Sequence, residues 1–320
     1  MNRNLILSFL FALIFAAAPC RAWNSTGHEI VAQITFDRLT PKTRGKIAAV
    51  LNQHPRLKED LLGDDVKAND ANLAAFLRAA TWPDMVRYPT NPLSHSENHP
   101  VWHYVDYPCN FDGLQGEVPD EKWDGSSDPA NLVQAMQKMT RELKDPATPK
   151  SRAAIDICWV EHLVGDIHQP LHAVSLYSRE FPDGDRGGHL EIVRASADIT
   201  EPLHSYWDGV EGQSMDPRDI RAAADRIEHD HPFEQIKAQA GNLSVTAWAG
   251  ESLELSRTAV YLNATLPHSR RGQNQDAIDP ATVPALPADY AKNARAVADG
   301  RIALAGYRLA AVLEDLASGW

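Results

Sequence analysis

The chain is short of cysteine, and this excludes several kinds of protein. It has 3 cysteines in 320 residues, and Cys20 lies in the N-terminal leader described below. The other two, Cys109 and Cys158, are too few for a zinc site made of thiolates or for a disulfide-stapled fold. An oxidising compartment would permit a disulfide between them. The alternative is a buried free thiol, since Cys158 lies in an apolar helical segment.

Long apolar runs are confined to the N-terminus. Arg3 precedes an apolar stretch over 5–18, and Pro19-Cys20-Arg21-Ala22 follows it. This order is typical of a secretory signal peptide cleaved after Ala22, so we expect a secreted or periplasmic protein that begins at Trp23. Acylation of Cys20 is disfavoured by the proline before it. No later segment is apolar enough for a membrane span.

Positive charge is also scarce. The sequence has 31 Lys and Arg against 43 Asp and Glu, a formal charge of −12, and removal of 1–22 would lower it to −14. Proteins that bind long nucleic acids are usually basic, so extensive contact with a phosphate backbone is disfavoured. Hydrophobic residues make up 43% of the chain, enough for a sizeable core. We therefore expect a leader over 1–22 and one domain over 23–320.

Helical patterns dominate this domain, which predicts a mainly α fold with a small β element. Thr40-Pro41, Ser127-Asp128-Pro129 and Asp216-Pro217 resemble helix starts, in which a capping side chain precedes a first-turn proline. Only 189–194 has the pattern of a strand. The expected helices cover 28–39, 41–53, 127–143, 151–167 and 217 onward, and two long helical stretches with glycines as breaks cover 232–262 and 287–317. The expected loops cover 88–100, 107–127, 179–189 and 268–286.

Histidine and aspartate are concentrated in two helical pairs. His162 and Asp166 are four residues apart on one predicted helix, so both side chains project from the same face. His204 and Asp208 repeat this spacing, and His172 follows Pro170, which ends the first helix. Imidazole and carboxylate together form a typical zinc donor set. A single pair of this kind is more often a hydrogen-bonded surface pair, and only the joint occurrence of both pairs with His172 indicates a metal site.

Further candidate ligands lie upstream. Asp84 follows a rigid turn in Thr81-Trp82-Pro83-Asp84, and His103 lies between aromatic residues. Trp23 and His28 lie at the predicted mature terminus, where a free α-amine and its own carbonyl oxygen can chelate a metal. Taken alone, Asp84 would be a turn residue and His103 a core histidine.

In this order, the motifs resemble a known family. Trp23…His28, Trp82-Pro83-Asp84, Trp102-His103-Tyr104, His162-x3-Asp166-x-His168-Gln169-Pro170-Leu171-His172, Gly187-Gly188 and His204-x3-Asp208 are similar to those of the zinc-dependent single-strand-specific nucleases of the mung bean nuclease type. That family is related to the bacterial zinc phospholipases C. The resemblance spans nearly the whole mature chain and implies a trinuclear zinc phosphodiesterase with 3′-nucleotidase activity, acting on single-stranded DNA and RNA.

The resemblance also implies roles for individual residues. Three Zn²⁺ are expected, with Asp166 bridging the first two; His168 is expected to be structural. Asp84 would orient the attacking water, and Arg87 would stabilise the charged transition state. The expected ligand sets are Asp84, His103, His162 and Asp166 for the first ion, Trp23, His28 and Asp166 for the second, and His172, His204 and Asp208 for the third.

Substrate contacts are expected from Tyr104, which would stack on a base, and from Asp106, which would hydrogen-bond it. Tyr177 is a further candidate for stacking. The family usually has Gly-Gly-Asn where Gly187-Gly188-His189 stands here, so His189 either replaces the Asn contact or begins a strand. The segment near 57–72 and the loop between His172 and His204 are longer than is usual in the family.

Two other functions compete with this interpretation. A zinc phospholipase C would share the metal centre, but it usually has Glu where Asp208 stands and needs a lipid-accessible surface. A non-catalytic zinc-binding protein would leave Arg87 and Tyr104 without a role. A Ser-His-Asp hydrolase is disfavoured, because no Gly-x-Ser-x-Gly motif is present. We expect a monomer whose partners are nucleic acid and nucleotide substrates, without a stable protein partner or a membrane.

Overall fold

We describe the protein from a computed structural model that covers residues 23–63, 70–270 and 280–320. The predicted signal peptide, residues 1–22, lies outside the described residues, so its cleavage stays a prediction. Within the described ranges, no helix is both long and apolar enough to cross a membrane.

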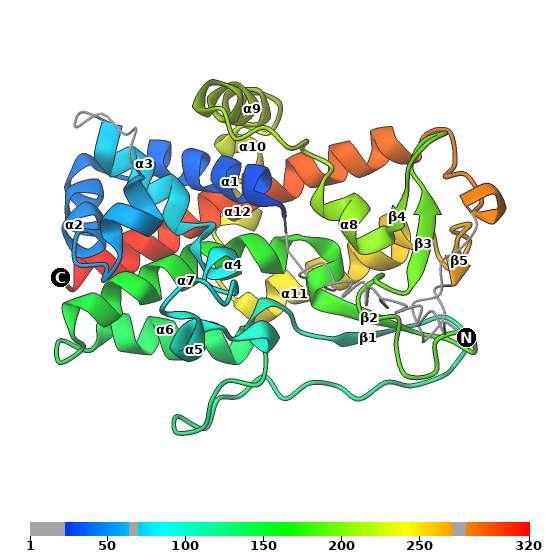
Figure 1. Cartoon of the computed structure of the whole chain (residues 1–320), viewed down its shortest axis with the longest axis horizontal. Helices are drawn as coiled ribbons and strands as arrows, with labels where there is room; N and C mark the ends of the chain where they lie inside the picture. The colour runs from blue at the N-terminus through cyan, green and yellow to red at the C-terminus, as the bar shows by residue number, and fades with distance from the viewer. Residues whose placement is uncertain (1–22, 64–69, 271–279) are drawn as a thin grey trace, which may run out of the picture.

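The fold is built around helix α7 (Lys150–His168), nearly all of which is buried. Helices α1 (Ser25–Arg38) and α12 (Tyr290–Ser318) pack against each other and against α7, and α6 (Leu132–Lys144) packs along another side of it (Figure 1). The predicted mainly α class is confirmed. Because α7 is enclosed by other helices, its polar side chains must be satisfied inside the protein.

Shorter elements surround this core. The remaining α-helices are α2 (Pro41–Leu51), α3 (Ala71–Ala79), α4 (Trp82–Met85), α5 (Ser94–Glu97), α8 (Leu203–Asp208), α9 (Pro217–Asp230), α10 (Phe233–Ala240) and α11 (Val245–Leu255). Short 3₁₀ turns cover Pro100–His103, Pro170–Ala173 and Pro280–Thr282, and π turns cover Leu57–Leu62 and Ser256–Val260.

The predicted helix starts have mixed outcomes. Thr40 caps α2 and Asp216 caps α9, as their sequences predict. The start at Ser127-Asp128-Pro129 is wrong: α6 begins at Leu132, and the side chain of Asn131 caps it by accepting from the Gln134 amide. The helical stretch predicted over 232–262, with glycines as its breaks, is confirmed, because the chain breaks at Gly241 between α10 and α11.

Two small sheets lie at one end of the helical body (Figure 1). β1 (Tyr107–Asn110) pairs in parallel with β2 (Val174–Tyr177), so the loop predicted over 107–127 is wrong at its start. In the second sheet, β3 (Glu191–Arg194) lies between the antiparallel strands β4 (Thr200–Pro202) and β5 (Ser269–Arg270). The predicted strand over 189–194 corresponds to β3, which begins two residues later than expected.

The two cysteines outside the predicted leader are free thiols and do not form a disulfide. Cys109 lies in β1 and Cys158 in α7, and both are buried free thiols. Burial raises the pKa of Cys109 to about 12, so this thiol stays protonated and unreactive at neutral pH.

Candidate metal centre

The carboxylate of Asp166 lies at the centre of a buried cluster. Its Oδ1 is 3.2 Å from Nε2 of His28, and its Oδ2 is 3.2 Å from Nδ1 of His103 and 3.3 Å from Nε2 of His162. Helix α7 carries two of these residues on one face, as their spacing predicts. The other two come from α1 and from the turn Pro100–His103, so the fold brings together residues that are distant in sequence.

Asp84 and Arg87 lie beside this cluster. Asp84, on α4, can present a carboxylate oxygen within 4.8 Å of ring nitrogens of both His103 and His162. Nη1 of Arg87 is 3.3 Å from Oδ1 of the same carboxylate. The Arg87 side chain is 15% exposed, so it is largely shielded from water while remaining at the edge of the cluster.

A second buried group contains the two histidines that are predicted to bind the third ion. Nε2 of His172 is 3.0 Å from Nε2 of His204, and Nε2 of His204 is 3.6 Å from Oδ2 of Asp208. His172 lies in the turn after α7, whereas the other two lie on α8. The predicted ligands of the third ion therefore lie together.

Backbone carbonyls fix how three of these imidazoles are oriented. Nδ1 of His162 is 2.8 Å from the Ala80 carbonyl oxygen, Nδ1 of His172 is 2.7 Å from that of His103, and Nδ1 of His204 is 2.6 Å from that of Gly187. A neutral ring that donates from Nδ1 presents the lone pair of Nε2 on its other side. In each case Nε2 points into the cluster, as in metal sites whose histidines are held by outer hydrogen bonds.

Gly187 cannot be replaced at low cost. Its φ is +59°, and a Cβ there would lie 2.6 Å from the Leu171 carbonyl oxygen. The geometry of this close turn, rather than any side chain at 187, supplies the carbonyl that orients His204.

The donor atoms fit a metal ion better than they fit each other. With both Nδ1 atoms donating, His172 and His204 turn two lone pairs toward each other across 3.0 Å, which is favourable only with a cation between them. Ligands about 2.0–2.1 Å from a tetrahedral zinc lie a similar distance apart, at about 3.3 Å. Burial also lowers the pKa of His28, His103 and His162, which keeps them in the neutral form that ligands require.

The first residues that the structure describes lie close to the centre. Trp23 is fully buried, and the next residue, Asn24, donates its backbone amide to the Asp208 carbonyl oxygen at 3.0 Å. The Asn24 side chain also caps α1 by accepting from the Gly27 amide, which sets the direction of the helix that carries His28. This arrangement brings the beginning of the domain beside α8.

The predicted substrate residues lie along the segment after His103. Tyr104 and Asp106 are both half-buried. Burial, and then the nearby carboxylate of Asp185, raises the pKa of Asp106 to about 6, so its carboxyl group titrates near neutral pH. The Tyr177 ring packs so closely on Gly116 that a Cβ there would lie 2.3 Å from it; backbone therefore covers part of this candidate stacking surface.

His189 lies outside β3, and its ring stacks on that of His204. The ring centroids are 3.9 Å apart and the planes are inclined by 19°. The residue that departs from the usual Asn therefore contacts a predicted ligand directly.

Sequence reasoning missed two buried residues that organise this region. Nε2 of Gln169 donates to Oδ1 of Asp208 at 2.7 Å. Asp185 accepts from the amides of Leu176 and Gly188 and from the Tyr261 hydroxyl, which holds the loop that ends at Gly187. The position of Gln169 inside the His-Gln-Pro-Leu-His run could have indicated its role. No sequence pattern indicated a role for Asp185.

Comparison with known proteins identifies the chain's relatives. The S1/P1 Nuclease family matches residues 23–318. The chain belongs to this family. It is 26% identical to Endonuclease 4 of Arabidopsis thaliana over 92% of this chain and 89% of that protein, and 25% identical to Nuclease S1 of Aspergillus oryzae over 98% of each.

Membership of the S1/P1 nuclease family confirms the predicted enzyme class and substrate class. The chain is a nuclease, a hydrolase of phosphodiester bonds whose substrates are nucleic acids. The described residues of this S1/P1 nuclease also hold three buried His/Asp groups able to bind metal ions: His28, His162 and Asp166; Asp84, His103 and His162; and His172, His204 and Asp208.

Proposed function

We propose that this S1/P1 nuclease is a trinuclear zinc enzyme that hydrolyses single-stranded DNA and RNA to 5′-nucleotides and also acts as a 3′-nucleotidase. The observation that carries the proposal is the position of Asp166, whose two carboxylate oxygens face different imidazoles. A carboxylate in this position can bridge two metal ions. The third buried group would then hold a further ion.

The ligand assignment follows these contacts. Asp84, His103, His162 and Asp166 would hold the first zinc, and His172, His204 and Asp208 the third. Asp166 and His28 would hold the second, together with the amine and carbonyl oxygen of Trp23. Cleavage after Ala22 would free that amine, so export of the protein and assembly of its metal centre would depend on the same cut.

The residues around the metals would act on the scissile phosphate. Bound zinc ions would activate water and neutralise the developing negative charge. Asp84 would accept a hydrogen bond from the attacking water and orient it. Arg87, held beside Asp84 at 3.3 Å, would donate to a phosphate oxygen as charge accumulates in the transition state.

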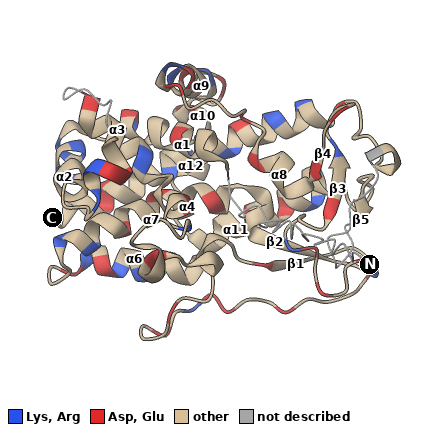
Figure 2. Cartoon of the chain, viewed as in Figure 1, with Lys and Arg blue, Asp and Glu red and all other residues tan. Residues whose placement is uncertain are grey.

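The acidic surface favours a short substrate contact. Lys and Arg are interspersed with Asp and Glu on outer helices such as α9, so the basic residues there do not form a separate stripe (Figure 2). Three Zn²⁺ against the carboxylates of Asp84, Asp166 and Asp208 would leave a locally positive pocket inside an acidic protein. Such a pocket suits one phosphate with one or two unpaired bases, which Tyr104 would stack and Asp106 would hydrogen-bond.

The placement of His189 supports a part in the same substrate site. Its ring covers that of His204, so a substrate at the third ion would approach it. We also propose a monomeric protein, secreted or periplasmic. A zinc phospholipase C remains the competing function, and Asp208 in place of the usual Glu favours the nuclease.

The experiment that tests the proposal uses one zinc-loaded sample and four substrates. Single-stranded DNA, RNA, duplex DNA of the same sequence and phosphatidylcholine vesicles are assayed side by side. We expect rapid cleavage of both single strands, at least about tenfold slower cleavage of the duplex, and 5′-phosphate products. Turnover of phosphatidylcholine alone, or unchanged nuclease activity after complete zinc removal, would overturn the proposal.

A further inference from the structure

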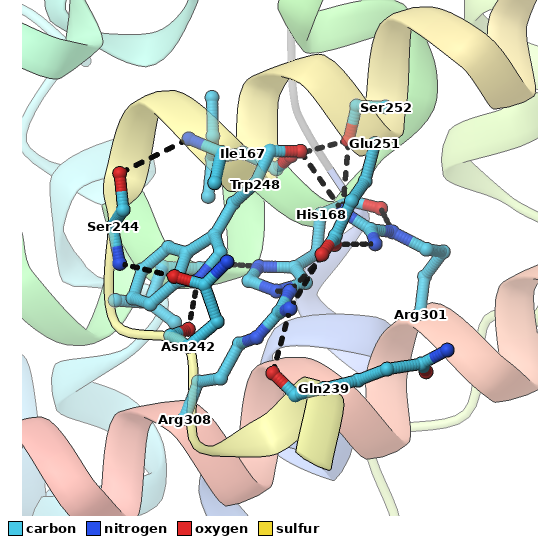
Figure 3. A network of polar contacts seen from close by, with 12 residues as sticks. Ile167, His168, Gln239, Asn242, Ser244, Trp248, Glu251, Ser252, Arg301 and Arg308 are labelled. Carbon is cyan, nitrogen blue, oxygen red and sulfur yellow. Dashed lines mark hydrogen bonds and ion pairs between the residues drawn. The ribbon is translucent and has the colours of Figure 1, made fainter. Parts of the chain in front are cut away.

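A buried network of charged side chains lies behind the metal centre, between α7, α11 and α12 (Figure 3). Arg301 and Arg308 of α12 are 3% and 0% exposed and share the carboxylate of Glu251 on α11. Nη1 of Arg301 is 2.6 Å from Oε2, while Nη1 and Nη2 of Arg308 are each 2.7 Å from a carboxylate oxygen. Burying two arginines with one carboxylate is costly unless their remaining donors find acceptors.

Two of those acceptors belong to His168, the last residue of α7. The last carbonyls of a helix have no partners within the helix. Here Nε of Arg301 donates to the His168 carbonyl oxygen at 3.2 Å. Two serines extend the pattern: Ser252 Oγ donates to the Ile167 carbonyl oxygen at 2.6 Å, and Ser256 Oγ to that of Pro170 at 2.8 Å. Three carbonyls over four residues are therefore held from α11, α12 and the π turn.

The ring of His168 is fixed by the same network. Its Nδ1 is 2.8 Å from the Val164 carbonyl oxygen, one helical turn back, and its Nε2 is 2.8 Å from Nη1 of Arg308. Nδ1 therefore donates and Nε2 accepts. Arg308 also donates to the Gln239 carbonyl oxygen at 3.0 Å, which ties α10 to the assembly. His168 thus serves the network and faces away from the metal ligands.

The segment held in this way joins the two parts of the metal centre. Asp166 lies just before it, Gln169 lies within it and holds Asp208, and His172 lies just after it. Asp166 is inside α7, whose own hydrogen bonds maintain it. His172 and Gln169 lie beyond the helix, where the outside donors replace the missing helical bonds. The position of the third group relative to the first therefore depends on these donors.

We infer that Ser252, Ser256 and Arg301 are positioning residues that hold the segment 167–170, and that this segment sets the third metal group relative to the pair around Asp166. The inference rests on the proposed zinc function. It predicts an unequal effect: weakening the donors loosens the third ion while the ions at Asp166 stay bound. A general loss of stability would instead weaken all ions together.

The test compares the double variant Ser252→Ala/Ser256→Ala with Arg301→Lys, which keeps the charge but loses the planar set of donors. Thr35→Val is the matched control, because the buried Thr35 hydroxyl shares its single hydrogen between the carbonyl oxygens of Val31 at 2.8 Å and Gly306 at 3.1 Å within the α1–α12 packing. Zinc per protein is measured against increasing chelator, together with thermal unfolding of the metal-free proteins and kcat and KM.

We expect both serine and arginine variants to retain about two zinc ions at chelator concentrations where the wild type retains three. Changes in groups that support metal ligands typically cost about 10–100-fold in affinity. The control should unfold at a lower temperature but lose its ions in the wild-type pattern. Variants that unfold earlier yet keep wild-type zinc retention would overturn the inference. A wild type that binds no zinc would instead overturn the proposed function.

Discussion

At the scale of single residues, the candidate ligands are held by groups that are not themselves ligands. His162, His172 and His204 each direct Nδ1 at a backbone carbonyl oxygen, and Gln169 holds Asp208. Each outer hydrogen bond restricts the rotation of a candidate ligand side chain without any contribution from a metal ion. The ligand geometry is thereby built into the backbone of the turns that supply these carbonyls.

Asp84 is the residue whose chemical role can be tested most simply. Asp84→Asn keeps the size of the side chain and removes the charge beside Arg87. We expect kcat on single-stranded DNA to fall by about 10²–10⁴, the range for a lost general base. The measurement is steady-state kinetics at saturating zinc, with thermal unfolding of the metal-free protein as a check on folding.

Asp198→Asn provides the control, since Asp198 is exposed in the turn between β3 and β4. It should leave kcat unchanged within about twofold, as surface substitutions usually do. A similar small effect of Asp84→Asn would remove Asp84 from the mechanism.

The sequence predicts which candidate ligands lie together where two of them are one helical turn apart on the same helix. His162 and Asp166, like His204 and Asp208, were predictable as pairs because four residues make about one helical turn. The partners of their Nδ1 atoms were not, because the carbonyls of Ala80, His103 and Gly187 reach the site only through the folded chain.

At the scale of elements, the close approach of α1 and α12 supports His28. A Cβ on Gly306 would lie 2.5 Å from Cγ2 and 2.7 Å from Cβ of Ile34. A larger residue at this crossing would therefore push apart the two helices, one of which carries a predicted ligand.

Two glycines of α12 give a matched pair of substitutions. We expect Gly306→Ala to lower the free energy of unfolding by about 1–3 kcal/mol, since overpacking a core costs this much. Gly300→Ala should raise it by about 0.5–1 kcal/mol, because a Cβ there meets nothing closer than 3.6 Å and alanine favours helix. Urea unfolding of both variants measures the difference; equal effects would contradict the packing described here.

Element boundaries were predictable where the signal is local. Thr40 and Asp216 cap their helices through amides two or three residues away. At the start of α6, Ser127 instead joins a turn in which Asp124 accepts from its amide, and Asn131 provides the cap. The pairing of β1 with β2 joins segments more than 60 residues apart, so no local sequence pattern predicts it.

At the scale of the whole molecule, a buried histidine makes stability depend on pH. His54 is 4% exposed, its Nδ1 accepts from the Arg56 amide at 3.2 Å, and its ring meets the Trp82 ring edge-on. Burial lowers the pKa of His54 to about 4. Because this value lies below that of the unfolded chain, the contribution is fully present above about pH 6.5 and is lost as the pH falls toward 4.

His54→Gln tests this dependence in the metal-free protein. Between pH 7 and pH 5 the wild type should lose about 1–2 kcal/mol of unfolding free energy that the variant does not lose. Urea unfolding at both pH values measures the difference. If the variant lost as much as the wild type, a titrating His54 would not be the cause.

The most direct test of the central claim is a zinc titration of metal-free protein that begins at Trp23, followed by zinc content and cleavage of single-stranded DNA in the same samples. We expect activity to reach its maximum at three zinc ions per chain, and we expect less bound zinc and lower activity when one extra residue precedes Trp23. Full activity with fewer than three ions, or identical titrations for the two proteins, would contradict a trinuclear site with Trp23 as a ligand.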